Sequence, residues 1–182
     1  MDFNEMKKFT VKFKKLDPSA IIPSFKNEKD SGFDLHSTHD GIIKFGEITV
    51  IKTGLAIELP ESLCILSGEP EFVDGGKYSS ETFNPSIDLT PELQLRPRSG
   101  LALKEGITIV NTPATVDNGY RGEIMIITTR LKSGEYCFSK GERIAQGVIG
   151  LVLSTNCLIF KETDMLSRTE RGDGGFGKSG KF

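Results

Sequence analysis

The C-terminal stretch of the chain carries side chains and glycines that are suited to binding a phosphorylated ligand. In Arg171-Gly-Asp-Gly-Gly-Phe-Gly-Lys-Ser-Gly180, the cationic groups, the hydroxyl and the backbone N–H groups of the glycines can all donate to an anion. Residues 172–179 also match a phosphate-loop pattern, but such a loop must lead into a helix and only three residues follow. We interpret the stretch as a tail that closes over a phosphorylated, ring-bearing ligand, with a frayed glycine-rich terminus as the alternative.

A second group of phosphate-binding side chains lies in the middle of the chain. Pro97 restricts the preceding residue to extended backbone, after which Arg98, Ser99 and Gly100 present a guanidinium, a hydroxyl and a backbone N–H together. Gln146, at the entrance of a later strand, could donate a further hydrogen bond to an oxygen. An Arg-Ser-Gly turn is common, so this stretch alone is weak evidence for a phosphate site.

Residues 110–124 place an amide, a carboxylate and a phenol close together in sequence. The Asn118-Gly119 dipeptide between two apolar runs predicts a hairpin turn. Asp117 stands just before that turn and Tyr120 just after it, so both side chains are expected at one tip. Asn111 lies six positions ahead of Asp117, near enough to share a pocket wall. The alternative is an ordinary Asn-Gly hairpin with a capping aspartate and a surface tyrosine.

Asp34 is a carboxylate between apolar neighbours in an expected early strand, so it needs a partner. An arginine, a backbone donor or a metal-bound water could serve, and an ion pair is the simplest of these. His36 and His39 stand close by and suggest a zinc site. No later histidine or cysteine pair completes such a site, and we expect hydrogen-bonded or surface histidines instead.

Short apolar or alternating runs, separated by turn formers such as Asp40-Gly41 and Ser133-Gly134, must position these side chains. No amphipathic pattern is long enough for a three-turn helix, and only a short helix over residues 101–104 is expected. The pattern predicts an all-β domain, a sandwich or a barrel. The three cysteines lie in apolar stretches, which predicts buried, reduced thiols. The expected strands cover residues 9–14, 31–35, 48–51, 55–59, 63–66, 107–110, 124–127, 147–153 and 157–160.

Length and charge narrow the class of protein. A chain of 182 residues suits one domain with a sizeable core. The formal net charge of -2 gives no electrostatic reason to expect a nucleic acid or a membrane surface as partner. No apolar run approaches the length of a spanning helix, and the first residues lack the apolar core of a signal peptide. We therefore expect a cytoplasmic protein.

The segment of residues 67–92 breaks the rhythm of short strands. It is polar and rich in glycine, proline and serine, with isolated aromatic residues. A loop longer than about 15 residues in a compact domain is usually functional or disordered. We expect an insertion here, either a tolerated surface loop or a site for a protein partner.

Taken together, five of these stretches resemble the ordered motifs of the homotrimeric dUTP diphosphatases, the dUTPases. Only the third and fifth are distinctive alone, but all five stand in the family's order. The resemblance implies a β jelly roll, a homotrimer with active sites shared between subunits, a β domain over residues 1–168 and a C-terminal arm over residues 169–182. The five stretches are Ser31-Gly-Phe-Asp-Leu35, Pro97-Arg-Ser-Gly-Leu-Ala102, Asn111 with Asp117-Asn-Gly-Tyr-Arg-Gly122, Arg143-Ile-Ala-Gln146 and Arg171–Gly180.

The resemblance also implies an activity, the hydrolysis of dUTP to dUMP and pyrophosphate, which keeps uracil out of DNA and supplies dUMP for thymidylate synthesis. Asp117 would orient and deprotonate the water that attacks the α-phosphorus. Asn111 would contact the uracil edge, and Tyr120 would pack on the deoxyribose and exclude a 2′-hydroxyl. Asp34 would act through water on a Mg²⁺ ion held mainly by the phosphates. The phosphates and the base would further be held by Arg98, Ser99, Gly100, Gln146, Arg171, Phe176, Gly177, Lys178 and Ser179.

Four positions depart from the family pattern: Ser31, Ala114, Gly147 and Lys178. Gly147 replaces a bulky aliphatic residue, which predicts looser packing beside the phosphates, and Lys178 adds a positive charge near them. Two alternatives to the diphosphatase stay open at this stage. One is a dCTP deaminase of the same fold, and the other is a dUTPase-like regulatory protein that binds a partner through residues 67–92.

Overall fold

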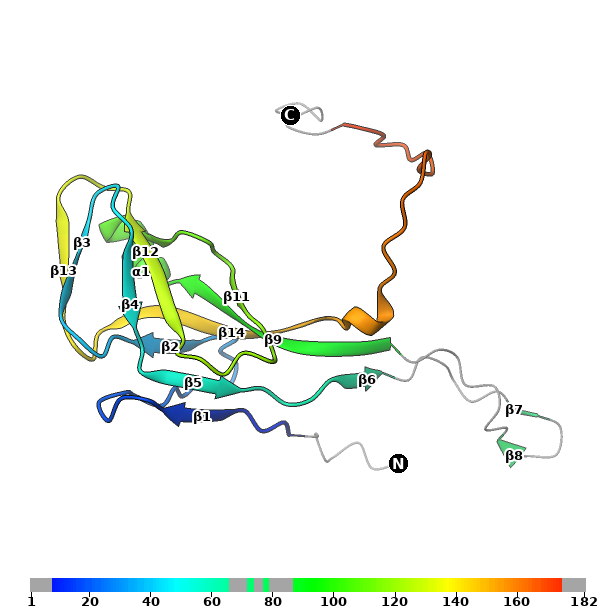
Figure 1. Cartoon of the computed structure of the whole chain (residues 1–182), viewed down its shortest axis with the longest axis horizontal. Helices are drawn as coiled ribbons and strands as arrows, with labels where there is room; N and C mark the ends of the chain where they lie inside the picture. The colour runs from blue at the N-terminus through cyan, green and yellow to red at the C-terminus, as the bar shows by residue number, and fades with distance from the viewer. Residues whose placement is uncertain (1–7, 66–71, 74–76, 79–86, 175–182) are drawn as a thin grey trace.

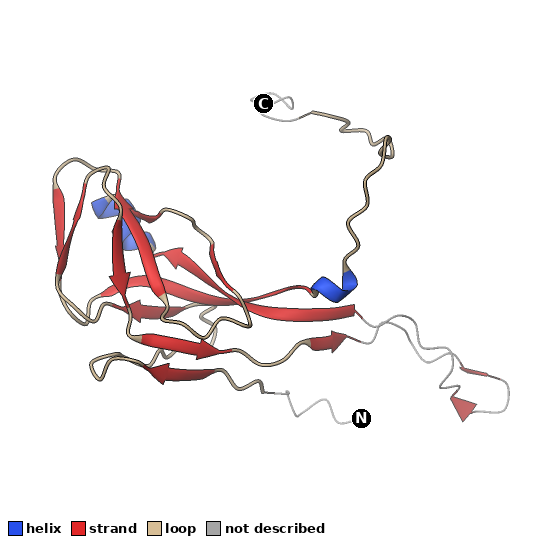
Figure 2. Cartoon of the chain, in the orientation of Figure 1, coloured by secondary structure: helices blue, strands red, loops and turns tan. Residues whose placement is uncertain are grey.

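Strands make up almost all of the regular structure of the chain (Figures 1 and 2). The computed structural model describes residues 8–65, 72–73, 77–78 and 87–174. All pairings between the strands in these ranges are antiparallel. The expected all-β class is therefore confirmed, and the arrangement fits a jelly roll.

The largest sheet has five strands and is built around two long ones. It runs in the order β11-β9-β14-β2, and β6 pairs with the other end of β9. β9 and β14 are eleven residues long and pair from Ala145 with Pro97 to Leu153 with Leu89. Two candidate site residues lie on this sheet, Asp34 on β2 and Gln146 on β14. Its strands are β2 (Phe33–His36), β6 (Leu63–Ile65), β9 (Ile87–Pro97), β11 (Ala114–Val116) and β14 (Arg143–Leu153).

A three-stranded sheet and three two-stranded ribbons complete the fold. The sheet runs in the order β10-β12-β4, with β10 (Ile107–Ile109), β12 (Met125–Arg130) and β4 (Thr49–Lys52). The short helix α1 (Ser99–Glu105) joins β9 to β10 and confirms the helix expected over residues 101–104. The ribbons are β1 (Lys12–Lys15) with β5 (Leu55–Glu58), β3 (Gly41–Lys44) with β13 (Glu135–Phe138), and β7 (Phe72–Val73) with β8 (Lys77–Tyr78).

Strand alternation separates the core from the face that carries the polar groups. In β2, Phe33 and Leu35 are buried in the hydrophobic core, so Asp34 and His36 lie on the other face of the strand. In β9, Leu93 and Leu95 are buried while Gln94 and Arg96 face the opposite way. The core is filled by Leu35, Ile43, Ile51, Leu55, Leu93, Ile124, Ile126 and Ile144, all below 3% exposure.

Two expectations about the course of the chain are wrong. The predicted strand over 157–160 is absent. The 3-10 turn η1 (Thr155–Cys157) follows the end of β14, and the side chains of Ile159 and Phe160 beyond it are almost fully exposed. After η1 the chain leaves the strands and runs away from them (Figure 1). The irregular segment expected over residues 67–92 is shorter than predicted, because residues 87–92 form the start of β9. Residues 67–71, 74–76 and 79–86 of that segment lie outside the described residues.

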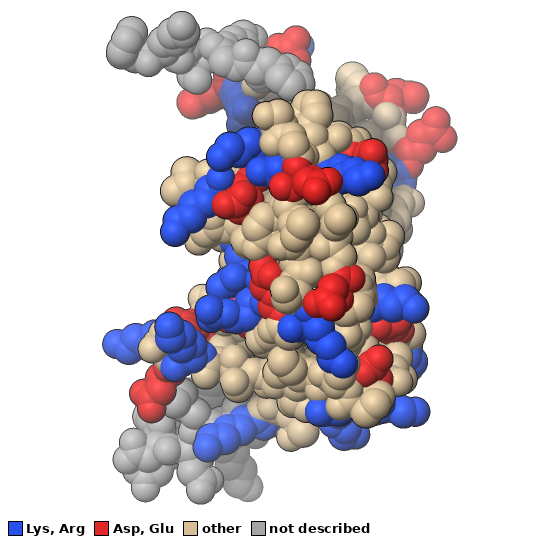
Figure 3. Space-filling model, turned by 90° about the vertical axis from the view of Figure 1, so that its left-hand side faces the viewer, with Lys and Arg blue, Asp and Glu red and all other residues tan. Residues whose placement is uncertain are grey.

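The surface of the protein mixes charges of both signs. Figure 3 shows Lys and Arg side chains interspersed with Asp and Glu over one face, in keeping with the low net charge. Within the described ranges, no helix is long and apolar enough to cross a membrane. Cys137 and Cys157 are free, as expected, but they are exposed rather than buried. In β13 the buried position is Phe138, so its neighbour Cys137 faces outward.

Candidate active site

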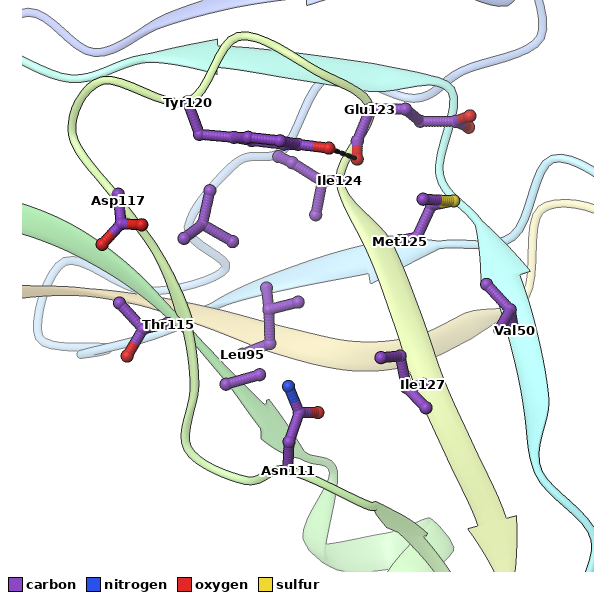
Figure 4. A pocket seen from close by; sticks show the side chains of 12 residues that line it. Val50, Leu95, Asn111, Thr115, Asp117, Tyr120, Glu123, Ile124, Met125 and Ile127 are labelled. Atoms are coloured by element: carbon purple, nitrogen blue, oxygen red, sulfur yellow. Dashed lines mark hydrogen bonds between the residues drawn. The ribbon is translucent and has the colours of Figure 1, made fainter.

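A cavity of about 290 Å³ brings together the amide, the carboxylate and the phenol that the sequence places between residues 110 and 124. Asn111 and Tyr120 project from opposite sides of it, with Asp117 at a third margin (Figure 4). We call it the Asp117 cavity. Its lining residues are Val50, Leu95, Asn111, Ala114, Thr115, Val116, Asp117, Tyr120, Glu123, Ile124, Met125 and Ile127.

Hydrogen bonds within and around the loop after β11 hold Asp117 and Tyr120 in place. The Tyr120 N–H donates to the carbonyl oxygen of Asp117 at 3.0 Å, which closes the expected Asn-Gly turn. The Asn118 amide donates to the carbonyl oxygens of Pro60 and Pro91, at 2.9 and 3.2 Å. The Tyr120 hydroxyl donates to the carbonyl oxygen of Glu123 at 3.1 Å (Figure 4). The backbone of the tip and the ring of Tyr120 are thus held by hydrogen bonds.

The turn does not, however, join two paired strands, as a simple hairpin would. β11 pairs with β9, whereas β12 pairs with β10 and β4, so the Asn118-Gly119 turn connects two different sheets. Gly119 is not among the glycines with positive φ, which a two-residue type I′ hairpin requires. The expected tip is confirmed, but it lies where the chain crosses between sheets and opens a cavity there.

The chemistry of the Asp117 cavity suits a flat ring with a polar edge. Leu95, Ile124 and Ile127 supply apolar walls, and Asn111 can both donate and accept hydrogen bonds. Asp117 is exposed, and its carboxylate accepts no hydrogen bond from the described part of the chain. A carboxylate left open in this way can hold a water molecule beside a bound ligand.

A second cavity, of about 440 Å³, is suited to a polyanion. Four cationic side chains line it, Lys26, Arg96, Arg98 and Arg143, against two carboxylates, Asp30 and Asp34. We call it the Asp34 cavity. The other lining residues are Ser24, Ser31, Gly32, Phe33, Gln146 and Val148.

Asp34 is ion-paired with two arginines in this cavity. Its Oδ1 lies 3.0 Å from Nε of Arg98, and its Oδ2 lies 3.2 Å from Nη1 of Arg143. Arg98 also donates from Nη1 to the carbonyl oxygen of Arg143 at 2.9 Å. The ion pair expected as the simplest partner of Asp34 is therefore present. The remaining N–H groups of Arg98 are left for a ligand.

A β-bulge explains how β14 sends two polar side chains into the same cavity. Arg143 pairs with His36 and Ala145 with Leu35, so Ile144 is an extra residue. Without the bulge, Arg143 and Gln146 would face opposite sides of the sheet, because they are an odd number of positions apart. Gln146 donates to the carbonyl oxygen of Pro97 at 2.9 Å, which orients its amide.

The two cavities lie against opposite faces of the same strand. Leu95 lines the Asp117 cavity and the next residue, Arg96, lines the Asp34 cavity. Successive side chains of a strand point to opposite faces. No described residue lines both cavities. The chain thus keeps apart the cavity suited to a flat ring and the cavity suited to a polyanion.

Comparison with known proteins identifies the chain. The family model for dUTPase matches residues 82–180. A deoxyuridine 5′-triphosphate nucleotidohydrolase of Nautilia profundicola is 42% identical over 171 residues, which covers 94% of this chain and 99% of that protein. The chain belongs to the dUTPase family. The insertion expected over residues 67–92 relative to that family stays a prediction.

Solved structures of dUTPases share the fold. A structure of the Staphylococcus bacteriophage 80alpha dUTPase with dUPNHPP superposes with a TM-score of 0.69 at 25% identity and covers 94% of this chain and 98% of that one. A point mutant of the dUTPase from phage phi11 of S. aureus, described with a structural Mg(II) ion, has a TM-score of 0.63 at 18% identity and covers 87% and 99% of the two chains.

The remaining dUTPase motif residues lie outside both cavities or outside the described residues. Ser99 and Gly100 are exposed on the first turn of α1, next to Arg98. Arg171 is exposed and donates from Nε to the carbonyl oxygen of Gly174 at 2.9 Å. The predicted roles of Phe176, Gly177, Lys178 and Ser179 concern residues that the structure does not describe.

Sequence reasoning placed Arg143 in a motif without giving it a role, and misjudged Gly147. The direction of the Arg143 side chain could not be predicted, because it depends on the bulge. Gly147 does not loosen the packing: a Cβ atom there would come within 2.5 Å of the ring of Phe33 and 2.9 Å of Leu93. The ring of Phe33 fills the space that an aliphatic side chain would take.

A Mg²⁺ ion fits this dUTPase site only if the ligand supplies most of its oxygens. Among the described residues, no three His, Cys, Asp or Glu side chains gather as a metal site. Asp34 is balanced by two guanidiniums, and Asp30 accepts hydrogen bonds from Asn27. Asp34 keeps 30% of its side chain exposed, enough to receive a hydrogen bond from a metal-bound water.

His36 borders the charged cluster and resists protonation. Burial lowers its pKa, the guanidiniums of Arg143 and Arg98 lower it further, and only Asp34 opposes them. Its Nδ1 is buried and has no hydrogen-bond partner among the described residues. The other histidine, His39, is engaged through Nδ1 with the carbonyl oxygen of Asp40 and accepts from the N–H of Lys52.

Proposed function

We propose that the chain hydrolyses dUTP to dUMP and pyrophosphate. The observation that carries this proposal is the Asp117 cavity, in which an amide, a phenol ring and an unengaged carboxylate surround a space with apolar walls. Relatives named as deoxyuridine 5′-triphosphate nucleotidohydrolases support the same substrate.

Asp117 is the proposed general base. Its carboxylate takes a proton from a water molecule as the water oxygen bonds to the α-phosphorus and the bond to the bridging oxygen of pyrophosphate breaks. The pyrophosphate leaves with the electron pair of that bond. A positioned base of this kind contributes about 10²- to 10⁴-fold. The loop bonds of Asn118 and Tyr120 support this role, because they fix the backbone that carries the carboxylate.

Asn111 and Tyr120 select the nucleoside in this proposal. The Asn111 amide pairs with the uracil edge, and cytosine would leave polar groups there unpaired at about 1–3 kcal/mol each. Tyr120 packs its ring on the deoxyribose. Its hydroxyl is already tied to the Glu123 carbonyl, which holds the ring where a ribose 2′-hydroxyl would need space.

The Asp34 cavity is the proposed phosphate site. Arg98 and Gln146 line it and hold the phosphates, together with the backbone and hydroxyl of the neighbouring Ser99-Gly100. Asp34 would hold a Mg²⁺ ion through its water molecules. The ion, when bound, neutralises phosphate charge. The arm that contains Arg171, Phe176, Gly177, Lys178 and Ser179 closes over base and phosphates in this proposal.

Because the two cavities face opposite ways, we propose that each active site combines the Asp117 cavity of one subunit with the Asp34 cavity of another, in a homotrimer. Exposed apolar side chains beside the Asp117 cavity support a subunit contact there. Val50 is 48% exposed, Met125 43% and Val110 49%. We also propose that the protein acts in the cytoplasm. There it would remove dUTP before DNA synthesis and supply dUMP for thymidylate synthesis.

A nucleotide panel tests the proposal. Pyrophosphate release is measured with dUTP, dCTP, dTTP and UTP, with and without Mg²⁺. We expect turnover of dUTP alone at a high rate, and a loss of turnover when Mg²⁺ is chelated. Ammonia release from dCTP would support the deaminase instead, and equal rates with all four nucleotides would refute the selective site.

A further inference from the structure

A lysine outside all five motif stretches lines the Asp34 cavity. Lys26 belongs to the loop between β1 and β2 and stands with Arg96, Arg98 and Arg143 around the same space. We propose that Lys26 binds the β- and γ-phosphates of dUTP and the pyrophosphate product. This inference rests on the proposed function of the cavity as the phosphate site.

Lys26 is the cation of this cavity that the described part of the protein leaves unengaged. Arg98 and Arg143 share the carboxylate of Asp34. Arg96 donates to Oε1 of Gln94 at 2.6 Å. Lys26, by contrast, has no hydrogen bond or ion pair with any residue in the described ranges. All of its N–H donors are therefore available to an incoming anion.

The carboxylates nearby do not compete for Lys26. Asp30 is occupied by Asn27, whose backbone N–H donates at 3.0 Å and whose amide donates at 3.0 and 3.2 Å. Four cations against two carboxylates leave the cavity with a net charge of +2, and half of that excess is lost without Lys26. The lysine therefore supplies a large part of the field that attracts a polyphosphate.

The loop holds the backbone of Lys26 on both sides. The ring of Phe25 makes an edge contact with the buried ring of Phe33, with centroids 5.9 Å apart. On the other side, the Asn27–Asp30 turn is closed by a backbone bond of 3.2 Å in addition to the carboxylate bonds. Less backbone entropy is lost on binding when the loop is already fixed.

The variant Lys26→Gln tests the inference, with Lys29→Gln as the matched control because Lys29 shares the loop but does not line the cavity. Pyrophosphate binding is measured by calorimetry without turnover, and dUTP hydrolysis is measured by steady-state kinetics. For Lys26→Gln we expect the Kd of pyrophosphate and the KM of dUTP to rise by about 2- to 10-fold, as for a partly screened charge-assisted contact. The kcat should stay within about twofold, and inhibition by dUMP, which lacks the outer phosphates, should not change.

Two further results complete the test. Lys26→Arg should bind pyrophosphate as the wild type does, and Lys29→Gln should match the wild type throughout. Equal behaviour of Lys26→Gln and Lys29→Gln would overturn the inference while leaving dUTP hydrolysis intact. A wild-type chain that binds pyrophosphate but does not hydrolyse dUTP would instead refute the proposed function, so the two failures are distinguishable.

Discussion

Nε of Arg98 lies 3.0 Å from Oδ1 of Asp34, so the proposed phosphate-binding guanidinium is held by a carboxylate before any ligand arrives. Arg98 is the residue that precedes α1, and Asp34 lies on β2. These two positions are far apart in sequence and meet only in the folded protein. A guanidinium that is already oriented loses less freedom when it binds a phosphate.

The first prediction concerns Asp34→Asn. The amide can still accept from Arg98, but its NH₂ group then faces the donor of Arg143. We expect kcat/KM for dUTP to fall by about 10- to 100-fold, as for loss of a positioning partner. The free energy of unfolding should change by less than about 1 kcal/mol, because the group is partly exposed. Asp30→Asn, which removes the other carboxylate of the cavity, is the control and should keep more activity in the same assay.

The second prediction concerns Asp117→Asn. Loss of the proposed base should lower kcat by about 10²- to 10⁴-fold and leave binding of a non-hydrolysable dUTP analogue nearly unchanged. Single-turnover kinetics and calorimetry measure the two quantities. Glu135→Gln, an exposed carboxylate on β13, serves as control. Full turnover by the Asp117 variant would remove this residue from the mechanism.

The third prediction concerns packing at Gly147, whose added Cβ would meet the ring of Phe33 at 2.5 Å. Gly147→Ala should lower the free energy of unfolding by about 1–3 kcal/mol, the usual cost of overpacking. Phe33→Leu in the same chain should recover part of that loss, so the two changes are not additive. Urea denaturation of the four chains measures the coupling, and strict additivity would show that the ring is not the obstacle.

The fourth prediction concerns pH. Burial lowers the pKa of His36, so the unfolded chain, with a value near 6.5, binds a proton more readily than the folded chain. The unfolding free energy should therefore fall as pH drops through 6.5 toward the lower folded pKa. His36→Gln should lose less stability than the wild type between about pH 7.5 and about pH 5.5. An identical loss in both chains would mean that His36 does not contribute.

The fifth prediction concerns the C-terminal arm. The hydrogen bonds made by Arg171, Gly172 and Gly174 connect residues within 169–174, so removal of the chain after Arg168 should leave the melting temperature and assembly unchanged. Turnover should drop by about 100-fold or more, since a closing segment positions the substrate. Differential scanning calorimetry, sedimentation and the dUTP assay measure these effects. A truncated chain with full activity would contradict the closing role.

Residues close together in sequence could be placed from the sequence alone, whereas the pairing register of distant strands could not. The Asn118-Gly119 turn fixes Asp117 and Tyr120 within four residues, so their shared tip could be predicted. The direction of Arg143 depends on a bulge against β2, which no local pattern reveals. β9 was missed although Ile87, Leu89, Pro91, Leu93 and Leu95 alternate with polar residues, because a proline in a central strand argues against one.

The resemblance to the dUTPases implied active sites shared between subunits, but no local pattern showed which residues belong to which half. Leu95 and Arg96 are neighbours in sequence, yet each belongs to a different cavity. The motif order gives no hint of this, because it depends on which face of β9 packs on the core. Once Leu93 and Leu95 are known to be buried, strand alternation shows that Arg96 faces the other cavity.

The position of the two cavities on opposite faces of β9 has a genetic consequence. If each chain contributes to two different sites, a chain without Asp117 and a chain without Arg98 are each inactive alone but carry different defects. Random mixing in a closed ring should then produce about a quarter of sites with both intact halves. Two inactive alleles, expressed together, should complement each other.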